Sequence, residues 1–201
     1  MPIKKHNPYK IVQMFEEEVA SYTRAPYAVS VDSCTNALFL ICKYLEVKEV
    51  TIPSKTYLSV PMSIIHAGGE VIFDKSEKTN HWVGIYQLKP YPIYDAAKRL
   101  TSNMYIPGSY MGLSFHIKKH LGIGKGGMIL TDNKGAVDWF KKVRYEGRSE
   151  KYYKEDSIPN KTLTVLNQIL NENLNKNIKK IYFNGKVLEL LSILFNTSNE
   201  F

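Results

Sequence analysis

Two polar sites in the sequence, one a cluster and one a single residue, have side chains that could hold or transform a ligand. The first is Ser33-Cys34-Thr35-Asn36, which lies between an apolar run and a buried helical pattern. Free backbone N–H groups at such a helix start, together with the Thr35 hydroxyl, would bind a phosphate. The second is Asp95, a single carboxylate followed by two alanines that leave room for a ligand ring.

A third cluster combines basic residues with glycines. Residues 114–121 contain Lys118, Lys119 and His120, and they lead into Gly122, Gly124, Gly126 and Gly127. This density of glycine indicates close backbone approach or positive φ angles. A lysine beside such a turn has the amine needed for covalent chemistry with a carbonyl group.

Each cluster also has an ordinary structural explanation. Ser and Thr cap helices in all kinds of proteins, and an Asp at a strand end can do the same. A single lysine in a Lys-rich chain is far more often a solvated charge than a nucleophile. The residue types alone therefore leave both interpretations open.

Alternating strand and helix patterns position these clusters. Helical spacing of apolar residues predicts helices over residues 11–22, 36–45, 56–66 and 135–145. Short apolar or β-branched runs predict strands over residues 27–31, 49–52, 70–73, 91–94, 113–115 and 128–130. The alternation predicts an α/β fold with a mostly parallel central sheet flanked by helices, and the clusters then follow the carboxyl ends of strands, where ligands collect.

The pattern changes after about residue 156. Asn, Lys, Ile and Leu dominate there, and only helical spacing persists. We therefore predict a large domain over residues 1–156 and a divergent helical tail over residues 157–201. A chain of 201 residues that is 44% hydrophobic is long enough to bury one core.

Composition excludes several classes of protein. The net charge of +8 would suit a polyanion, but no arginine-rich helix or aromatic-basic repeat is visible, so we expect no nucleic-acid partner. Cys34 and Cys42 form neither a disulfide framework nor a metal motif, which favours a reducing, cytoplasmic setting. No apolar run approaches the roughly 20 residues that cross a bilayer, and we expect no membrane association or metal site.

The order of four motifs narrows the choice of function. They are SxTxAL from Ser33, PxxTY from Pro53, DAA from Asp95 and SFHxxKxLxxGxGG from Ser114. Over about residues 8–148 the chain resembles the DegT/StrS-type aminotransferases, which are fold-type I enzymes dependent on pyridoxal 5′-phosphate. The resemblance implies the large domain of that fold.

The resemblance also implies a role for each matched residue. Lys119 aligns with the lysine that binds the cofactor aldehyde covalently and moves the proton, and Asp95 aligns with the carboxylate that faces the pyridine nitrogen. Tyr57 aligns with the aromatic residue that stacks on the ring. The phosphate contacts are implied for Ser33, Cys34, Thr35 and Ser114. The sequence favours packing rather than catalysis for His116.

The implied reaction is ping-pong transamination. An amino-acid donor, commonly glutamate in the family, leaves its nitrogen on the cofactor, and a nucleotide-linked keto-sugar then accepts it. Because active sites in this family use residues of both subunits, the resemblance also implies a homodimer.

The chain departs from the family pattern at several places. Lys98 stands where Gln or His is common, Lys125 where Glu is usual, and Cys34 where Gly is usual. The family's small domain is missing or diverged from about Ser157 onward, either as a natural variant or through a shifted reading frame. An alternative function is therefore a truncated, non-catalytic remnant that at most binds the cofactor.

Overall fold

A computed structural model describes residues 10–76 and 83–144. The predicted boundary at residue 156 and the predicted helical tail lie outside these residues. Among the described helices, none is long and apolar enough to cross a membrane.

The described chain alternates short helices and strands. In chain order the elements are α1 (Lys10–Thr23), β1 (Tyr27–Val31), α2 (Cys34–Tyr44), β2 (Glu49–Pro53), α3 (Ser59–Ala67), β3 (Glu70–Asp74), β4 (Tyr86–Leu88), β5 (Ile93–Asp95), β6 (Tyr110–Ser114), β7 (Gly127–Thr131) and α4 (Lys134–Val143). Within the described residues every predicted helix and strand is present, although α3 begins three residues later and β6 three residues earlier than the pattern indicated. The sequence did not predict β4.

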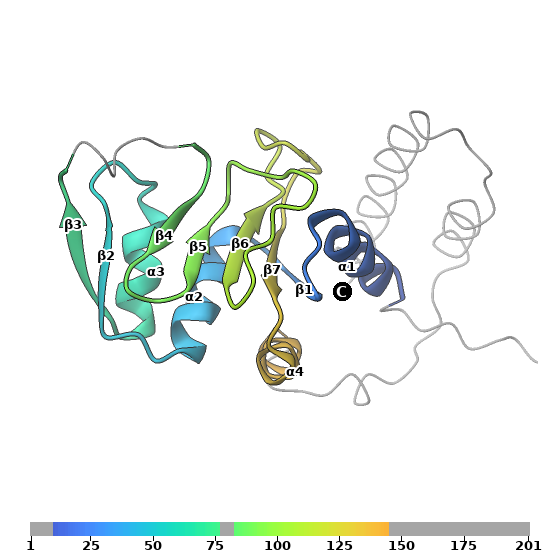
Figure 1. Ribbon diagram of the computed structural model, residues 1–201, viewed down its shortest axis with the longest axis horizontal. Coiled ribbons are helices and arrows are strands. Elements are labelled where there is room, and N and C mark those ends of the chain that lie inside the picture. Colours follow the sequence, from blue (N-terminus) through green and yellow to red (C-terminus); the bar gives the residue numbers. More distant parts are fainter. Residues whose placement is uncertain (1–9, 77–82, 145–201) are drawn as a thin grey trace, which may run out of the picture. The chain divides into compact units, whose positions relative to one another are not determined.

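The strands form a five-stranded sheet in the order β1-β7-β6-β5-β4 and a two-stranded sheet of β2 and β3. A reciprocal pair of backbone hydrogen bonds between Thr51 and Lys89 joins β2 to the residue after β4. In Figure 1 the strands accordingly follow one another from β3 to β1.

The prediction of a mostly parallel sheet is wrong, because the sheet is mixed. Only β5–β6 and β2–β3 pair in parallel, whereas β1–β7, β6–β7 and β4–β5 are antiparallel. The physical reason is clearest at β4, whose link to β5 consists only of residues 89–92. A parallel connection needs a crossover of about a dozen residues or more, so this link allows only antiparallel pairing.

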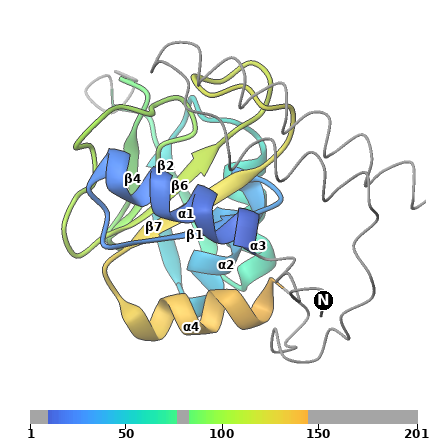
Figure 2. The same ribbon diagram turned by 90° about the vertical axis from the view of Figure 1, so that its right-hand side faces the viewer.

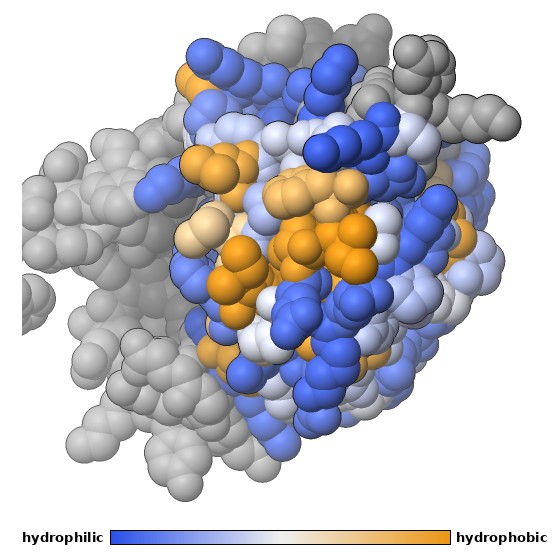
Figure 3. All heavy atoms as spheres, turned by 90° about the vertical axis from the view of Figure 1, so that its left-hand side faces the viewer, coloured by the Kyte–Doolittle hydropathy of each residue, from blue (hydrophilic) through white to orange (hydrophobic). Residues whose placement is uncertain are grey.

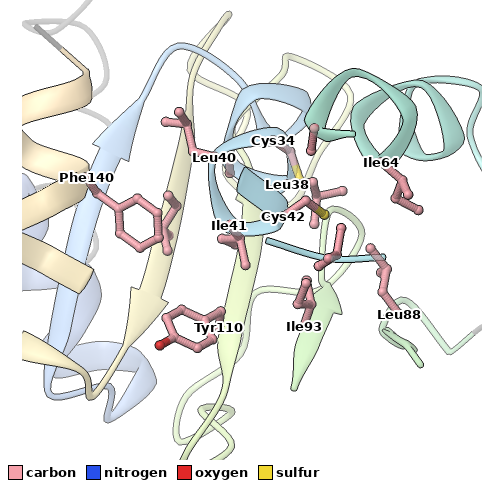
Figure 4. Packing of buried hydrophobic residues seen from close by; sticks show 14 of the residues in the cluster. Cys34, Leu38, Leu40, Ile41, Cys42, Ile64, Leu88, Ile93, Tyr110 and Phe140 are labelled. Carbon is pink, nitrogen blue, oxygen red and sulfur yellow. The ribbon is translucent and has the colours of Figure 1, made fainter. Parts of the chain in front are cut away.

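Both faces of the five-stranded sheet are buried. On one face, α2, α3 and α4 cover residues such as Val29, Ile93 and Ile129. Figure 4 shows Leu38 and Ile41 of α2 beside strand residues on this face. On the other face, Val19 of α1 belongs to a second cluster with strand residues of β1, β6 and β7. Figure 2 shows α1 and α4 as separate helices beside β1 and β7.

A buried ion pair ties the two ends of the described chain together. Glu16 of α1 is 4% exposed, and its Oε1 accepts hydrogen bonds from Arg144 Nη1 and from the backbone N–H and hydroxyl of Ser30. Lys141 of α4 lies 3.8 Å from the other carboxylate oxygen. Charges this deeply buried are tolerated only when they are paired, so α1, β1 and α4 depend on one another.

An apolar surface covers the opposite side of the molecule. In β3, which pairs only with β2 among the described strands, Ile72 and Phe73 are 43% and 48% exposed. Met62 and Ile65 of the neighbouring α3 are also exposed. Figure 3 shows apolar side chains gathered on this side.

Candidate functional site

The turn between β1 and α2 has the geometry of an anion site. Ser33 is the N-cap of α2, and its hydroxyl accepts a hydrogen bond of 3.1 Å from Asn36 N. The backbone N–H groups of a first helical turn have no partner within the helix and point toward its N-terminal end, where the helix dipole favours negative charge. Cys34 and Thr35 occupy this first turn. Ser33 therefore acts as the ordinary cap, and the turn still offers donors to a ligand.

A glycine-rich loop lies against this turn. Gly124 and Gly126 have φ angles of +109° and +133°, which L side chains rarely adopt. A Cβ atom on Gly127 would stand 2.3 Å from Ser33 C and 2.5 Å from Cys34 N. The sequence prediction of close approach and positive φ is confirmed, and the loop needs its glycines to reach the α2 turn.

The same loop carries Lys119. Lys119 N donates a hydrogen bond of 2.8 Å to His116 O, which forms a turn directly after β6. The predicted packing role of His116 is wrong, because its side chain is exposed and its Nδ1 accepts a hydrogen bond of 3.3 Å from Lys118 N. The loop leaves the sheet at Ser114. Phe115 is buried in the core and anchors the start of the loop, whereas residues 116–118 are exposed beyond the end of β6.

Asp95 closes β5 and is buried, with 2% of its surface exposed. Its Oδ1 accepts a hydrogen bond of 2.8 Å from Ala97 N, and its Oδ2 accepts one of 2.9 Å from the hydroxyl of Tyr86. Burial raises the pKa of Asp95, while these two donors and the nearby Lys119 and Lys98 act in the opposite direction. The site thus holds a carboxylate whose ionisation depends on its hydrogen-bond donors.

These groups surround one cavity of about 860 Å³. Its wall includes every residue that the sequence analysis assigned to the site, namely Ser33, Cys34, Thr35, Tyr57, Asp95, Ser114 and Lys119. The side chain of Tyr57 is 70% exposed, so its ring is available to a ligand. A cavity of this size accommodates a cofactor or small substrate.

The cavity is mainly basic. Lysines 55, 98, 118, 119 and 125 line it, against the carboxylates of Asp32 and Asp95. Cys34 adds no charge, because burial and, secondarily, the nearby Asp95 raise the pKa of its thiol well above the usual value. The balance favours a ligand that carries several negative charges.

Two residues near the cavity were missed in the sequence. Tyr86 contacts Asp95 and also hydrogen-bonds Thr56, which lines the cavity after β2. The available signal was the short spacing between the runs at 85–88 and 93–95, which predicts a hairpin and places Tyr86 opposite Asp95.

The residues present suit pyridoxal phosphate. A primary amine, a buried carboxylate, an exposed aromatic ring and a helix N-terminus are the groups that its aldehyde, ring nitrogen, ring face and phosphate would require. Cys34 and Thr35, the first residues of α2, both line the cavity. The site therefore has a suitable group for each end of this cofactor.

Comparison with protein families identifies the family of the chain. The family model described as "DegT/DnrJ/EryC1/StrS aminotransferase family" matches residues 4–88 and 107–176. The chain belongs to this family. The matched segments leave out the stretch between them, which contains Asp95, and the second segment continues past residue 156. The family assignment therefore rests on the rest of the chain, and the predicted domain boundary stays a prediction.

One curated relative and two solved structures are informative. The spore coat polysaccharide biosynthesis protein SpsC of Bacillus subtilis is 27% identical over 183 residues, covering 69% of this chain and 46% of its own. DesI, solved in the presence of its TDP-sugar product, has a TM-score of 0.55 and 17% identity over 69% of this chain and 45% of its own. NtdA of Bacillus subtilis, solved with bound cofactor PMP, has a TM-score of 0.57 and 18% identity over 94% of this chain and 49% of its own.

The two structures support the fold of this family, a mixed α/β architecture. The chain spans about half the length of the relatives it matches.

Proposed function

We propose that this chain binds pyridoxal phosphate covalently through Lys119 and forms the cofactor site of an aminotransferase. The observation that supports the proposal best is the convergence of Lys119, buried Asp95 and the N-terminus of α2 on one cavity in a member of this family. Each of these groups comes from a different strand end, so their meeting is a property of the fold and not of local sequence.

The residues have distinct tasks in this proposal. Pyridoxal phosphate supplies an aldehyde that reacts with amines and a ring that accepts electrons from the substrate. The amine of Lys119 holds the cofactor and, once free, moves a proton at the substrate Cα. Asp95 would hold a proton on the ring nitrogen, and the exposed ring of Tyr57 would stack on the cofactor. The amides of Cys34 and Thr35, the Ser33 turn and Ser114 bind the phosphate.

We further propose that the amino group passes from glutamate to a nucleotide-linked keto-sugar. Among the similar proteins, DesI was solved with its TDP-sugar product, and SpsC is a protein of spore coat polysaccharide biosynthesis. The excess of lysines around the cavity would attract the diphosphate of such a sugar. The homodimer and the cytoplasmic location stay predictions from the resemblance and the composition.

An absorbance titration tests the first step. The full chain is mixed with pyridoxal phosphate, and a visible band is expected that is absent in Lys119→Ala and present in Lys118→Ala. Lys118 is the matched control, because it lines the same cavity and has the same charge. Glutamate should then bleach the band. A wild-type chain without the band, or a band that survives in Lys119→Ala, would contradict the proposal.

A further inference from the structure

The carboxylate of Asp95 is held from both sides. Ala97 N, on the chain just after β5, donates to Oδ1, and the Tyr86 hydroxyl donates to Oδ2 over 2.9 Å. The Cys34 thiol lies 4.0 Å from Oδ1. Ala97 N is a backbone group and is fixed by the strand end. Of the two side-chain hydrogen bonds to Asp95, that from Tyr86 is the shorter, and a thiol is the weaker donor.

The hydrogen bonds continue beyond Tyr86. The Tyr86 oxygen is also bonded to Thr56 Oγ1. A phenol has one proton, and an ionised carboxylate can only accept, so Tyr86 donates to Asp95 and Thr56 donates to Tyr86. Thr56 directly precedes Tyr57 in the segment after β2. A chain of donors thus runs from the segment with the exposed ring to the buried carboxylate.

The reversal of β4 makes this contact possible. In the antiparallel pair Tyr86 stands opposite Asp95, so the first residue of β4 lies at the edge where β5 ends. A parallel β4 would place its first residue at the other edge of the sheet, away from the cavity. Figure 1 shows β4 between β5, which ends at Asp95, and β2, which ends at Pro53 three residues before Thr56.

We propose that Tyr86, supported by Thr56, is a positioning residue that orients the Asp95 carboxylate toward the cofactor site. This inference rests on the proposed function, because orientation matters only if Asp95 faces the cofactor ring. Tyr86 acts through Asp95 and does not itself touch the reacting atoms.

The charges around Asp95 determine the direction of the effect. Burial raises the pKa of Asp95, and Tyr86 is one of the groups that lower it, together with Ala97 N–H, Lys119 and Lys98. Burial, and then the charge of Asp95, raises the pKa of Tyr86 itself, so its hydroxyl stays protonated and remains a donor at neutral pH. Removing the hydroxyl therefore favours the neutral form of Asp95.

Tyr86→Phe in the full chain is the main variant, because it removes one oxygen and keeps the ring. Tyr91→Phe is the matched control: its hydroxyl accepts a hydrogen bond of 2.8 Å from Lys48 N, outside the cavity wall. Thr56→Val removes the hydroxyl that donates to Tyr86 and leaves the Tyr86–Asp95 hydrogen bond in place. It is informative even if Tyr86→Phe is poorly folded.

Two measurements are made on each protein. The first is an NMR titration of the Asp95 carboxyl carbon without cofactor, with the signal assigned by its loss in Asp95→Asn. The second is the affinity for pyridoxal phosphate from the Lys119-dependent band. We expect Tyr86→Phe to move the titration to higher pH and to weaken cofactor binding about tenfold, the effect of losing one hydrogen bond to a charged group. Thr56→Val should change both in the same direction by less, and Tyr91→Phe should change neither.

The outcomes separate the two proposals. If the wild type shows the band and Tyr86→Phe matches it in both measurements, the positioning role is refuted and cofactor binding stands. If the wild type shows no band, both proposals are refuted, because Asp95 then has no ring to face. The role would also be refuted if every protein shows the band and Tyr86→Phe shifts the Asp95 titration without changing the affinity for pyridoxal phosphate. The hydrogen bond would then affect the ionisation of Asp95 but not cofactor binding.

Discussion

Gly127 gives the sharpest test of how the cavity is built. A Cβ atom at this position would stand 2.3 Å from Ser33 C, and heavy atoms in contact normally keep about 3.5–4.0 Å. Gly127→Ala must therefore push β7 and the α2 turn apart by roughly 1 Å. The obstructing atoms belong to the backbone at the end of β1 and the start of α2, so no side-chain rotation can relieve the clash.

We expect Gly127→Ala to lower the free energy of unfolding by about 3 kcal/mol or more, at the upper end of the cost of overpacking. In urea this corresponds to a midpoint lower by about 1 M or more. Gly135→Ala is the control, because its added methyl group meets only Asn133 Oδ1 at 3.3 Å and Tyr44 OH at 3.8 Å on the exposed start of α4. It should change stability by less than about 1 kcal/mol. Equal midpoints for Gly127→Ala and wild type would refute the close approach.

Three further predictions concern buried polar groups. Glu16→Ala removes the carboxylate to which Arg144 donates and should cost about 3–5 kcal/mol in urea unfolding, whereas the exposed neighbour Glu17→Ala should cost little; similar losses for both would contradict the buried pair. Folding raises the pKa of Asp95, so the contribution of its protonated form to stability is complete at acidic pH and is lost as pH rises. The melting temperature of the wild type should therefore fall relative to that of Asp95→Asn between about pH 4 and neutral pH. Parallel curves of melting temperature against pH for the two proteins would argue against this. Burial raises the pKa of Cys34, and raises that of Cys42 to about 12, so neither thiol should react with a disulfide reagent at about pH 8 until urea unfolds the chain; rapid native labelling would disprove it.

The local pattern of the sequence was enough to locate most elements. Strands such as Tyr27–Val31 and Gly127–Thr131 are apolar or β-branched runs, and the stop of α3 at Gly68 follows from its φ of +96°. The structural role of the glycines after Lys119 could likewise be predicted, because glycines cluster where the backbone approaches another segment closely or adopts positive φ angles. In each case the cause lies within a few residues of the effect.

Long-range pairings could not be predicted in this way. Glu16 and Arg144 are separated by 128 positions, and nothing local indicates that they meet. β4 has three residues, too few to show a period, and its direction depends on the length of the link to β5. Tyr86 was missed together with β4, although the short link to β5 could have indicated the hairpin that pairs Tyr86 with Asp95.

The sequence predicted that the site residues lie together, although it predicted the wrong direction for some strands. The register of the strands explains why the grouping was still correct. Gly127, the first residue of β7, lies opposite both Val31 at the end of β1 and Ser114 at the end of β6. Tyr86, the first residue of β4, lies opposite Asp95 at the end of β5. A reversed strand therefore brings its amino end to the edge where its neighbours bring their carboxyl ends. A ligand site at that edge requires only that the ends converge, so reversing β4 leaves Asp95, Lys119 and the α2 turn in place and adds Tyr86 to them.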